Sequence, residues 1–161
     1  MDDDWVRGYR AELWRLLKQY GWVVQHVSAD GPGEFDYAYT VGLSSRGIPE
    51  MVIFGLSTRV AQTILNAAAR RALEGDVPVP GTVIGGLVQG YGLAVLEVQD
   101  VRQLALVHDV VGPGRLPRAC QLVFPDREGR WPWSAGSGVA DTPLLGDPQA
   151  SELGPWPVEG V

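Results

Sequence analysis

Cysteine is nearly absent from this sequence of 161 residues, which contains only Cys120. A single cysteine excludes a disulfide within the chain and suits a reducing compartment. The sequence also lacks any apolar run approaching the ~20 residues of a membrane span. Its first residues, MDDDW, are acidic, whereas a secretory signal begins with basic residues. We therefore expect a soluble, cytoplasmic protein without a membrane partner.

Basic residues are fewer than acidic ones, with 13 Lys and Arg against 19 Asp and Glu and a net charge of −6. Nucleic-acid-binding proteins usually gather basic residues on one face. Here the basic residues are scattered, and Arg70 and Arg71 form the only adjacent pair. The sequence therefore predicts no nucleic-acid partner. An acidic surface would suit a basic partner protein, such as a toxin held by an immunity-type protein.

Residues that carry metal or nucleophilic chemistry are equally scarce. A metal site needs three or four converging ligands, and His26 and His108 are far apart in the sequence. Cys120 lies in an apolar run, which favours a small core residue over a nucleophile. The glycine-rich residues 85–92 match neither the G-x-G-x-x-G spacing nor the P-loop. We expect no metal and no cofactor.

Hydrophobic residues make up 45% of the chain, which is enough for a core. Apolar residues at helical spacing predict helices over residues 4–20 and 58–74, with a weaker pattern over 100–111. Ser57 is a natural N-cap for the second helix. Strands are expected at residues 22–27, 35–43, 51–54, 93–98 and 119–124. Residues 76–92 are rich in glycine and proline, and residues 85–92 among them are interpreted as a flexible connection or lid.

These elements predict an α+β protein, with a single small domain over residues 1–135. Its sheet would be mostly antiparallel or mixed, with about five strands and two or three helices. Residues 136–161 are rich in Gly and Pro and carry only acidic charges. They predict a tail that is disordered or loosely packed, which Trp156 could anchor.

The run FDYAYTVGL, residues 35–43, alternates between two kinds of side chain. Aromatic and aliphatic residues fall on one side of a strand, and small or polar residues, including Thr40, fall on the other. We expect the first side to fill the core. The second side, partly polar, is expected to line a site.

Two carboxylates flank predicted strands: Glu50 precedes one and Asp126 follows another. Partial burial at a strand end can tune such a group for acid–base chemistry. It can equally hold a loop by accepting backbone N–H bonds. Nearby, Trp131 and Trp133 bracket a proline. They could form a contact surface or fold back over the core.

Three stretches carry a family resemblance. Residues 39–43 read Y-T-x-G-L, and residues 47–50 read G-I-P-E before the F-G-L of residues 54–56. Residues 121–133 read Q-L-V-x-P-D-x-x-G-x-x-P-W, and Gly21-Trp22 precedes the first strand. Their order and spacing resemble a bacterial family classed as a domain of unknown function, over roughly residues 20 to 134.

The resemblance implies no particular activity. It implies that one constellation contains Tyr39, Thr40, Glu50, Gln121 and Asp126. The family pattern has histidine before Pro-Glu, where this chain has Ile48. If that histidine were a metal ligand or a base, this chain would lack its activity, whereas a binding role would survive.

We expect a binding or interaction domain without chemistry of its own, for a small polar or aromatic molecule or a partner protein. Its expected contacts are Thr40, Glu50, Gln121 and Asp126 at one sheet end, rimmed by Trp131 and Trp133. One alternative is a small hydrolytic or tailoring enzyme with Glu50 or Asp126 as general base and Tyr39 or His26 as partner. Another is an immunity-type protein.

Overall fold

One mixed sheet of six strands forms the centre of the protein, in a computed structural model that describes residues 3–148 and 153–154. The strands are β1 (Val23–Val27), β2 (Tyr37–Val41), β3 (Glu50–Phe54), β4 (Val83–Val88), β5 (Tyr91–Glu97) and β6 (Ala119–Val123). Their order is β1-β2-β3-β6-β5-β4. The helices are α1 (Asp3–Tyr20), α2 (Thr58–Leu73) and α3 (Ala105–Val111), and a 3-10 turn, η1 (Leu43–Arg46), follows β2.

The two central strands run in the same direction. β3 and β6 are parallel and begin side by side, with Glu50 opposite Ala119, whereas the other neighbouring strands are antiparallel. The predicted α+β fold with a mixed sheet is therefore confirmed. The starts of β3 and β6 lie at the same end of the sheet as the last residues of β2.

The sixth strand, β4, covers residues 83–88, where the sequence predicted no strand. Residues 85–88 belong to β4, and Tyr91 and Gly92 belong to β5, so the interpretation as a flexible connection or lid is wrong for them. β4 pairs with β5, and the pairing shifts register between Ile84 and Val88, around Gly85 and Gly86. Glycine weakens a strand interior and often marks a bulge. The local sequence therefore carries no strand signal, and pairing with β5 determines the conformation.

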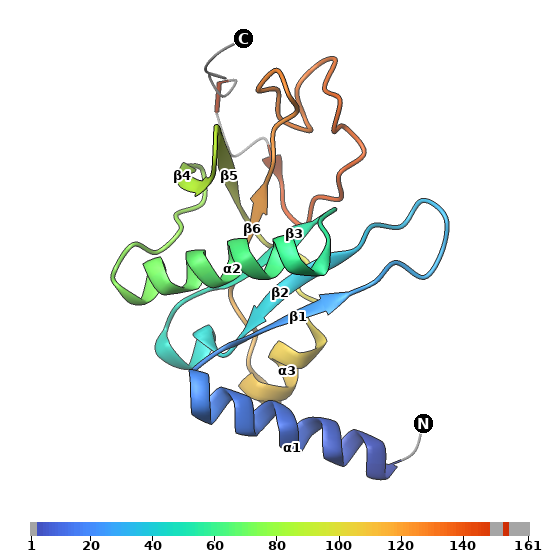
Figure 1. Ribbon diagram of the computed structural model, residues 1–161, viewed down its shortest axis with the longest axis vertical. Coiled ribbons are helices and arrows are strands. Elements are labelled where there is room, and N and C mark those ends of the chain that lie inside the picture. The colour runs from blue at the N-terminus through green and yellow to red at the C-terminus, as the bar shows by residue number, and fades with distance from the viewer. Residues whose placement is uncertain (1–2, 149–152, 155–161) are drawn as a thin grey trace.

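Helix α2 covers one face of the sheet (Figure 1). It begins after Ser57, whose hydroxyl accepts the N–H of Val60, which confirms the predicted cap. Its apolar side packs on side chains from four strands, among them Ala38, Ile53 and Cys120. Cys120 is buried in this cluster, which confirms its predicted role as a core residue.

The opposite face of the sheet is covered near β1 and β2 by α1 and α3. Figure 1 shows these two helices together at one end of the molecule, with α1 reaching away from the sheet. Within α1 only Leu13 is fully buried, and Trp5, Trp14 and Tyr20 are each more than half exposed. None of the helices in the described residues has the length and apolar content needed to cross a membrane.

Both faces of β2 are therefore buried, which corrects the expectation of an open polar face. Tyr39 and Val41 point toward α3 and α1, while Ala38 lies under α2. Thr40 is completely buried as well. Alternation along a strand shows which residues share a side. It does not reveal that a helix covers the side with the small and polar residues.

The segment after residue 138 lies against the sheet. The side-chain amide of Gln121 on β6 accepts the N–H of Leu145 at 2.8 Å and donates to the carbonyl of Pro143 at 2.7 Å. Leu145 is buried, and a Cβ on Gly146 would lie only 1.9 Å from the carbonyl oxygen of Glu97. Residues 143–146 thus pack against β6 and the end of β5. The sequence predicted disorder or loose packing for this region.

Within the described residues, the indole N–H of Trp131 donates to the carbonyl of Gly154 at 2.8 Å. Trp156, the proposed anchor, lies outside the described residues. The division of the chain at residue 135 therefore stays a prediction.

Replacing Gln121 with leucine should release the segment around Pro143 and Leu145. The change leaves a buried N–H and a buried carbonyl without partners, at about 1–3 kcal/mol for each group left unsatisfied. We expect a lower urea midpoint and faster proteolytic cleavage between residues 138 and 148. Gln62→Leu, on the exposed side of α2, is the matched control. Equal stability and equal cleavage of the two variants would contradict the role of Gln121.

Candidate functional site

The carboxylate of Glu50, at the start of β3, is completely enclosed by hydrogen-bond donors. Oε1 accepts from the Thr40 hydroxyl at 2.8 Å and from the N–H of Leu43 at 3.2 Å. Oε2 accepts from the N–H of Gly42 and of Ser44, both at 3.1 Å, and from the Ser44 hydroxyl at 2.7 Å. Glu50 is 1% exposed, so its carboxylate fills a nest of five donors at the beginning of η1.

The backbone around this nest depends on Gly42. Its φ of 119° lies in the region that favours glycine. A Cβ there would also lie 2.7 Å from the carbonyl oxygen of Gly21 and 2.8 Å from a methyl group of Leu17. The glycine of the Y-T-x-G-L pattern therefore allows the chain to turn sharply, so that three successive N–H groups face Glu50.

Burial raises the pKa of the Glu50 carboxyl above its ordinary value of 4.5, and hydrogen bonds from Ser44, Thr40 and Gly42 hold part of this rise back. A carboxylate surrounded by donors on both oxygens has no free lone pair directed at a substrate. The geometry therefore indicates a structural role for Glu50, which holds the β2–β3 connection in place.

Asp126 has a similar arrangement just after β6. Oδ1 accepts from the N–H of Glu128 at 3.0 Å and of Arg130 at 2.8 Å, while Oδ2 accepts from Nε of Arg130 at 3.0 Å and from the N–H of Gly138 at 2.9 Å. The N–H of Gly138 is the largest of the contributions that lower the pKa of Asp126 to about 2. Asp126 thus holds its own loop closed and fastens Gly138 to it.

The structure does not bring the predicted constellation together. Thr40 and Glu50 are in contact, and Tyr39 and Gln121 flank Val52 in the sheet register. However, Glu50 opens β3 whereas Asp126 follows the end of the parallel strand β6. The two carboxylates therefore lie at opposite ends of the sheet.

The other candidate residues also have structural partners. Burial raises the pKa of Tyr39 to about 12, and its hydroxyl accepts the N–H of Leu106 at 3.2 Å, which attaches α3 to the sheet. His26 Nε2 lies 3.2 Å from the carbonyl oxygen of Leu56, beyond the end of β3. Neither is paired with Glu50 or with Asp126.

The tryptophan pair folds back on the protein, which decides between the two interpretations of this loop. Trp131 is completely buried against Ala94, Leu96 and Val123, and its ring stacks on that of Trp133 with centroids 5.8 Å apart. Trp133 is half-buried at the edge of this cluster. Both tryptophans therefore cover the far part of the sheet, near β5 and β6.

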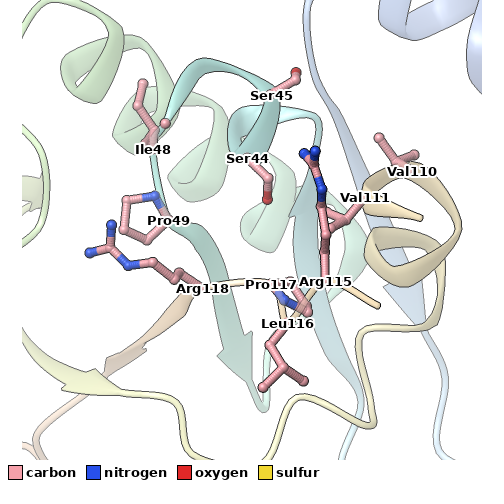
Figure 2. Close-up of a pocket in the computed structure, with 11 residues that line it drawn as sticks. Ser44, Ser45, Ile48, Pro49, Val110, Val111, Arg115, Leu116, Pro117 and Arg118 are labelled. Carbon is pink, nitrogen blue, oxygen red and sulfur yellow. The ribbon is translucent and has the colours of Figure 1, made fainter. Parts of the chain in front are cut away.

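A cavity of about 460 Å³ opens where β3 and β6 begin (Figure 2). It lies between the turn η1 on one side and the end of α3 with residues 115–118 on the other. The residues that line it are Ser44, Ser45, Gly47, Ile48, Pro49, Val110, Val111, Arg115, Leu116, Pro117 and Arg118. We call this cavity the sheet-end pocket.

Glu50 does not line the pocket, but it holds the two walls of the pocket in place. The Ser44 hydroxyl points inward to Glu50, and the Ser45 hydroxyl donates to the carbonyl of Gly42 at 2.7 Å. The backbone N–H of Glu50 donates to the carbonyl of Arg118 at 2.9 Å. One residue therefore joins both walls: its side chain holds η1, and its backbone holds the segment that carries Arg118.

Of the residues selected from the sequence, Thr40 and Glu50 shape the pocket. Gln121, Asp126 and the two tryptophans hold other parts of the protein. None of the selected residues lines the pocket. Arg115 and Arg118 stand in a segment without periodicity, after a Gly-Pro-Gly turn, and carry no motif signal. Ile48, the position at which the resemblance implies histidine, is half-buried in the pocket wall. Within the described residues, no three His, Cys, Asp or Glu side chains converge as a metal site would require.

Replacing Glu50 with alanine should leave five donors without an acceptor, three of them fully buried. Because each unsatisfied donor costs on the order of 1–3 kcal/mol, we expect the free energy of unfolding to fall by at least about 3 kcal/mol. Formate is small enough to refill the nest, so it should raise the Tm of the variant by binding the folded state alone. Thermal denaturation at increasing formate concentration measures this effect.

Glu74→Ala, at the exposed C-cap of α2, is the control and should show neither effect. Chloride at equal concentration corrects for ionic strength. If the alanine variant does not fold, Glu50→Gln is used instead; it keeps one acceptor oxygen, so the loss should be smaller, and formate should have no space to bind. A Glu50→Ala variant as stable as the wild type would be inconsistent with the nest.

The low pKa of Asp126 predicts a pH dependence of stability. The pKa falls from an ordinary 3.8 to about 2 on folding, so the stabilisation is present above pH 4 and is lost as the pH falls through 2. In Asp126→Asn the free energy of unfolding should change less between pH 4 and pH 2 than in the wild type. Urea titrations at several pH values measure this, with Asp141→Asn at an exposed position as control.

The comparison with family models confirms the resemblance to a domain of unknown function. The model of a domain of unknown function, DUF4262, matches residues 16–138. No curated protein and no solved structure matches the chain. The matched region contains the whole sheet, the Glu50 nest, the sheet-end pocket and the Asp126 loop. Since it spans well over half of the sequence, the chain belongs to the DUF4262 family.

Proposed function

We propose that this protein is a binding domain that holds a small molecule in the sheet-end pocket and performs no chemistry on it. The observation that carries the proposal is the pocket itself. Its volume of about 460 Å³ falls within the range of small-molecule sites, which are mostly apolar with a few polar groups. Ile48, Val110, Val111 and Leu116 supply the apolar wall, and Arg115 and Arg118 supply the polar groups.

The hydrogen bonds and protonation of the candidate acids and bases favour binding over catalysis. A general base needs a free lone pair within hydrogen-bond distance of the proton that it removes. The carboxylates of Glu50 and Asp126 accept five and four hydrogen bonds from the protein itself. Tyr39, with a pKa of about 12, keeps its proton at neutral pH. An enzyme with Glu50 or Asp126 as base is therefore the less favoured alternative.

The position of the pocket is also consistent with ligand binding. Its two walls come from segments that are far apart in the sequence, η1 with Pro49 and residues 110–118. Each wall is fastened to the sheet through Glu50. A site held by rigid neighbours needs little reordering when a ligand binds. An interaction with a partner protein, including an immunity-type partner, stays a prediction.

Blocking the pocket should abolish ligand binding without unfolding the protein. We expect at least one compound in a thermal-shift screen of metabolites to raise the Tm of the wild type by mass action. Ile48→Trp fills the pocket with an indole ring and should remove that shift. Val60→Trp, at an exposed position on α2, adds the same ring elsewhere and should keep it.

Three results would count against the proposal. A hit that survives in Ile48→Trp would place the site elsewhere on the protein. Conversion of the hit to a product would indicate an enzyme. A screen without hits, repeated with the same library by NMR, would leave the pocket without a ligand and turn the search to protein partners.

A further inference from the structure

The sheet-end pocket is lined by charge of one sign. Its ionisable side chains are Arg115 and Arg118, and no carboxylate lies among its lining residues. Two other hollows on the described surface have both signs in their lining: Asp100 with Arg102, and Asp76 with Arg71. A third hollow adjoins the pocket, shares Arg118 with it and adds Glu97. A cationic cavity on a chain with a net charge of −6 is a local exception to the acidic surface. Such a cavity favours an anionic ligand.

The two guanidinium groups are available for a ligand. Neither forms an ion pair within the part of the chain that the structure describes. Figure 2 shows Arg115 extending beside the turn that carries Ser44 and Ser45, while Arg118 points outward past Pro49. The hydroxyls of both serines are already engaged with Glu50 and Gly42. Among the polar side chains of the lining, the arginines are thus the donors left for a ligand.

At the η1 wall, the N–H groups of Gly42, Leu43, Ser44, Gly47 and Ile48 are already occupied. Phosphate sites are commonly built from successive N–H groups at the start of a helical turn. Here the N–H groups of Gly42, Leu43 and Ser44 all donate to Glu50. The N–H groups of Gly47 and Ile48 donate to the carbonyls of Ser44 and Leu43. The chain's own carboxylate fills the nest, so an external anion meets guanidinium groups instead of a phosphate cradle.

We propose that the ligand of the sheet-end pocket is a small organic carboxylate with an apolar body. This inference rests on the proposed function and names the chemical class of its ligand. The planar fork of a guanidinium matches the two oxygens of a carboxylate. Arg115 binds the carboxylate at the side of η1, and Arg118 strengthens the positive potential at the opening. The apolar body lies against Ile48, Val110 and Val111.

Phenylacetate is a suitable first probe, because it joins a carboxylate to a small apolar ring. Its neutral isostere phenylacetamide, together with phenyl phosphate and acetate, completes the set. Each probe is titrated into the full-length protein and followed by two-dimensional amide NMR. We expect phenylacetate to shift the resonances of Gly47, Ile48 and Val111 in a saturable manner. Phenylacetamide, phenyl phosphate and acetate should bind at least tenfold more weakly.

Charge-removing variants test the role of each arginine. Arg115→Gln should weaken phenylacetate binding at least tenfold, as expected for a charge-assisted bidentate contact. Arg118→Gln should weaken binding less. Added salt should reduce the difference in affinity between this variant and the wild type. Arg59→Gln, on the exposed side of α2, makes the same change in net charge and should leave the affinity unchanged. Because all three positions are exposed, the variants are expected to fold like the wild type.

The possible outcomes separate this inference from the proposed function. Equal binding of phenylacetate and phenylacetamide at the pocket resonances, unaffected by Arg115→Gln, would overturn the carboxylate and leave the pocket as a binding site. Tighter binding of phenyl phosphate would overturn the assigned class in favour of a phosphate ester. No change at the pocket with any probe would also overturn the inference, and the proposed function would then depend on the Ile48→Trp comparison alone.

Discussion

The hydrogen bonds around the Glu50 carboxylate are the interaction on which this end of the protein depends. A buried carboxylate is costly unless donors surround it, and the donors themselves are costly without an acceptor. Each therefore requires the other: the sharp turn at Gly42 presents three N–H groups, Thr40 and Ser44 add two hydroxyls, and Glu50 satisfies all five. This arrangement fixes η1, the start of β3 and, through the Arg118 carbonyl, the start of β6. The sheet-end pocket lies between the segments fixed in this way.

The same device recurs at two further positions. Gln121 uses both ends of its amide to hold residues 143–145, and Asp126 uses both oxygens to close its loop and attach Gly138. Each of these polar groups is buried, and each one organises a segment that has no regular secondary structure. A single fully satisfied polar side chain can order such a segment, because its directional bonds specify one backbone path. Thr40, Glu50, Gln121 and Asp126 therefore each have a structural role in this chain.

The pocket owes its chemistry to residues between these fixed points. Ile48 and Pro49 stand between the nest and β3, while Arg115 and Arg118 stand between α3 and β6. Arg115 and Arg118 are exposed, and Ile48 is only half-buried at the edge of the core. These side chains can therefore change with less effect on folding than Glu50 or Gln121. Ile48, the position at which the resemblance implies histidine, lies in the pocket wall. This arrangement supports a division in which buried polar residues preserve the scaffold and the lining residues set the ligand.

The sequence by itself determined the α+β class, helix α2 with its Ser57 cap, the core role of Cys120 and five of the six strands. Each of these follows from local periodicity or from the chemistry of single residues. It also indicated Glu50, Gln121 and Asp126 as special, though not what they do. Only the tertiary structure decided that β4 pairs across its glycines, that α2 covers the Thr40 side of β2, and that the two carboxylates lie at opposite ends of a parallel pair. It also decided that Arg115 and Arg118 share one cavity with η1. The physical reason is common to all four: strand order, layering and the meeting of distant loops depend on long-range contacts, and local sequence patterns carry no record of them.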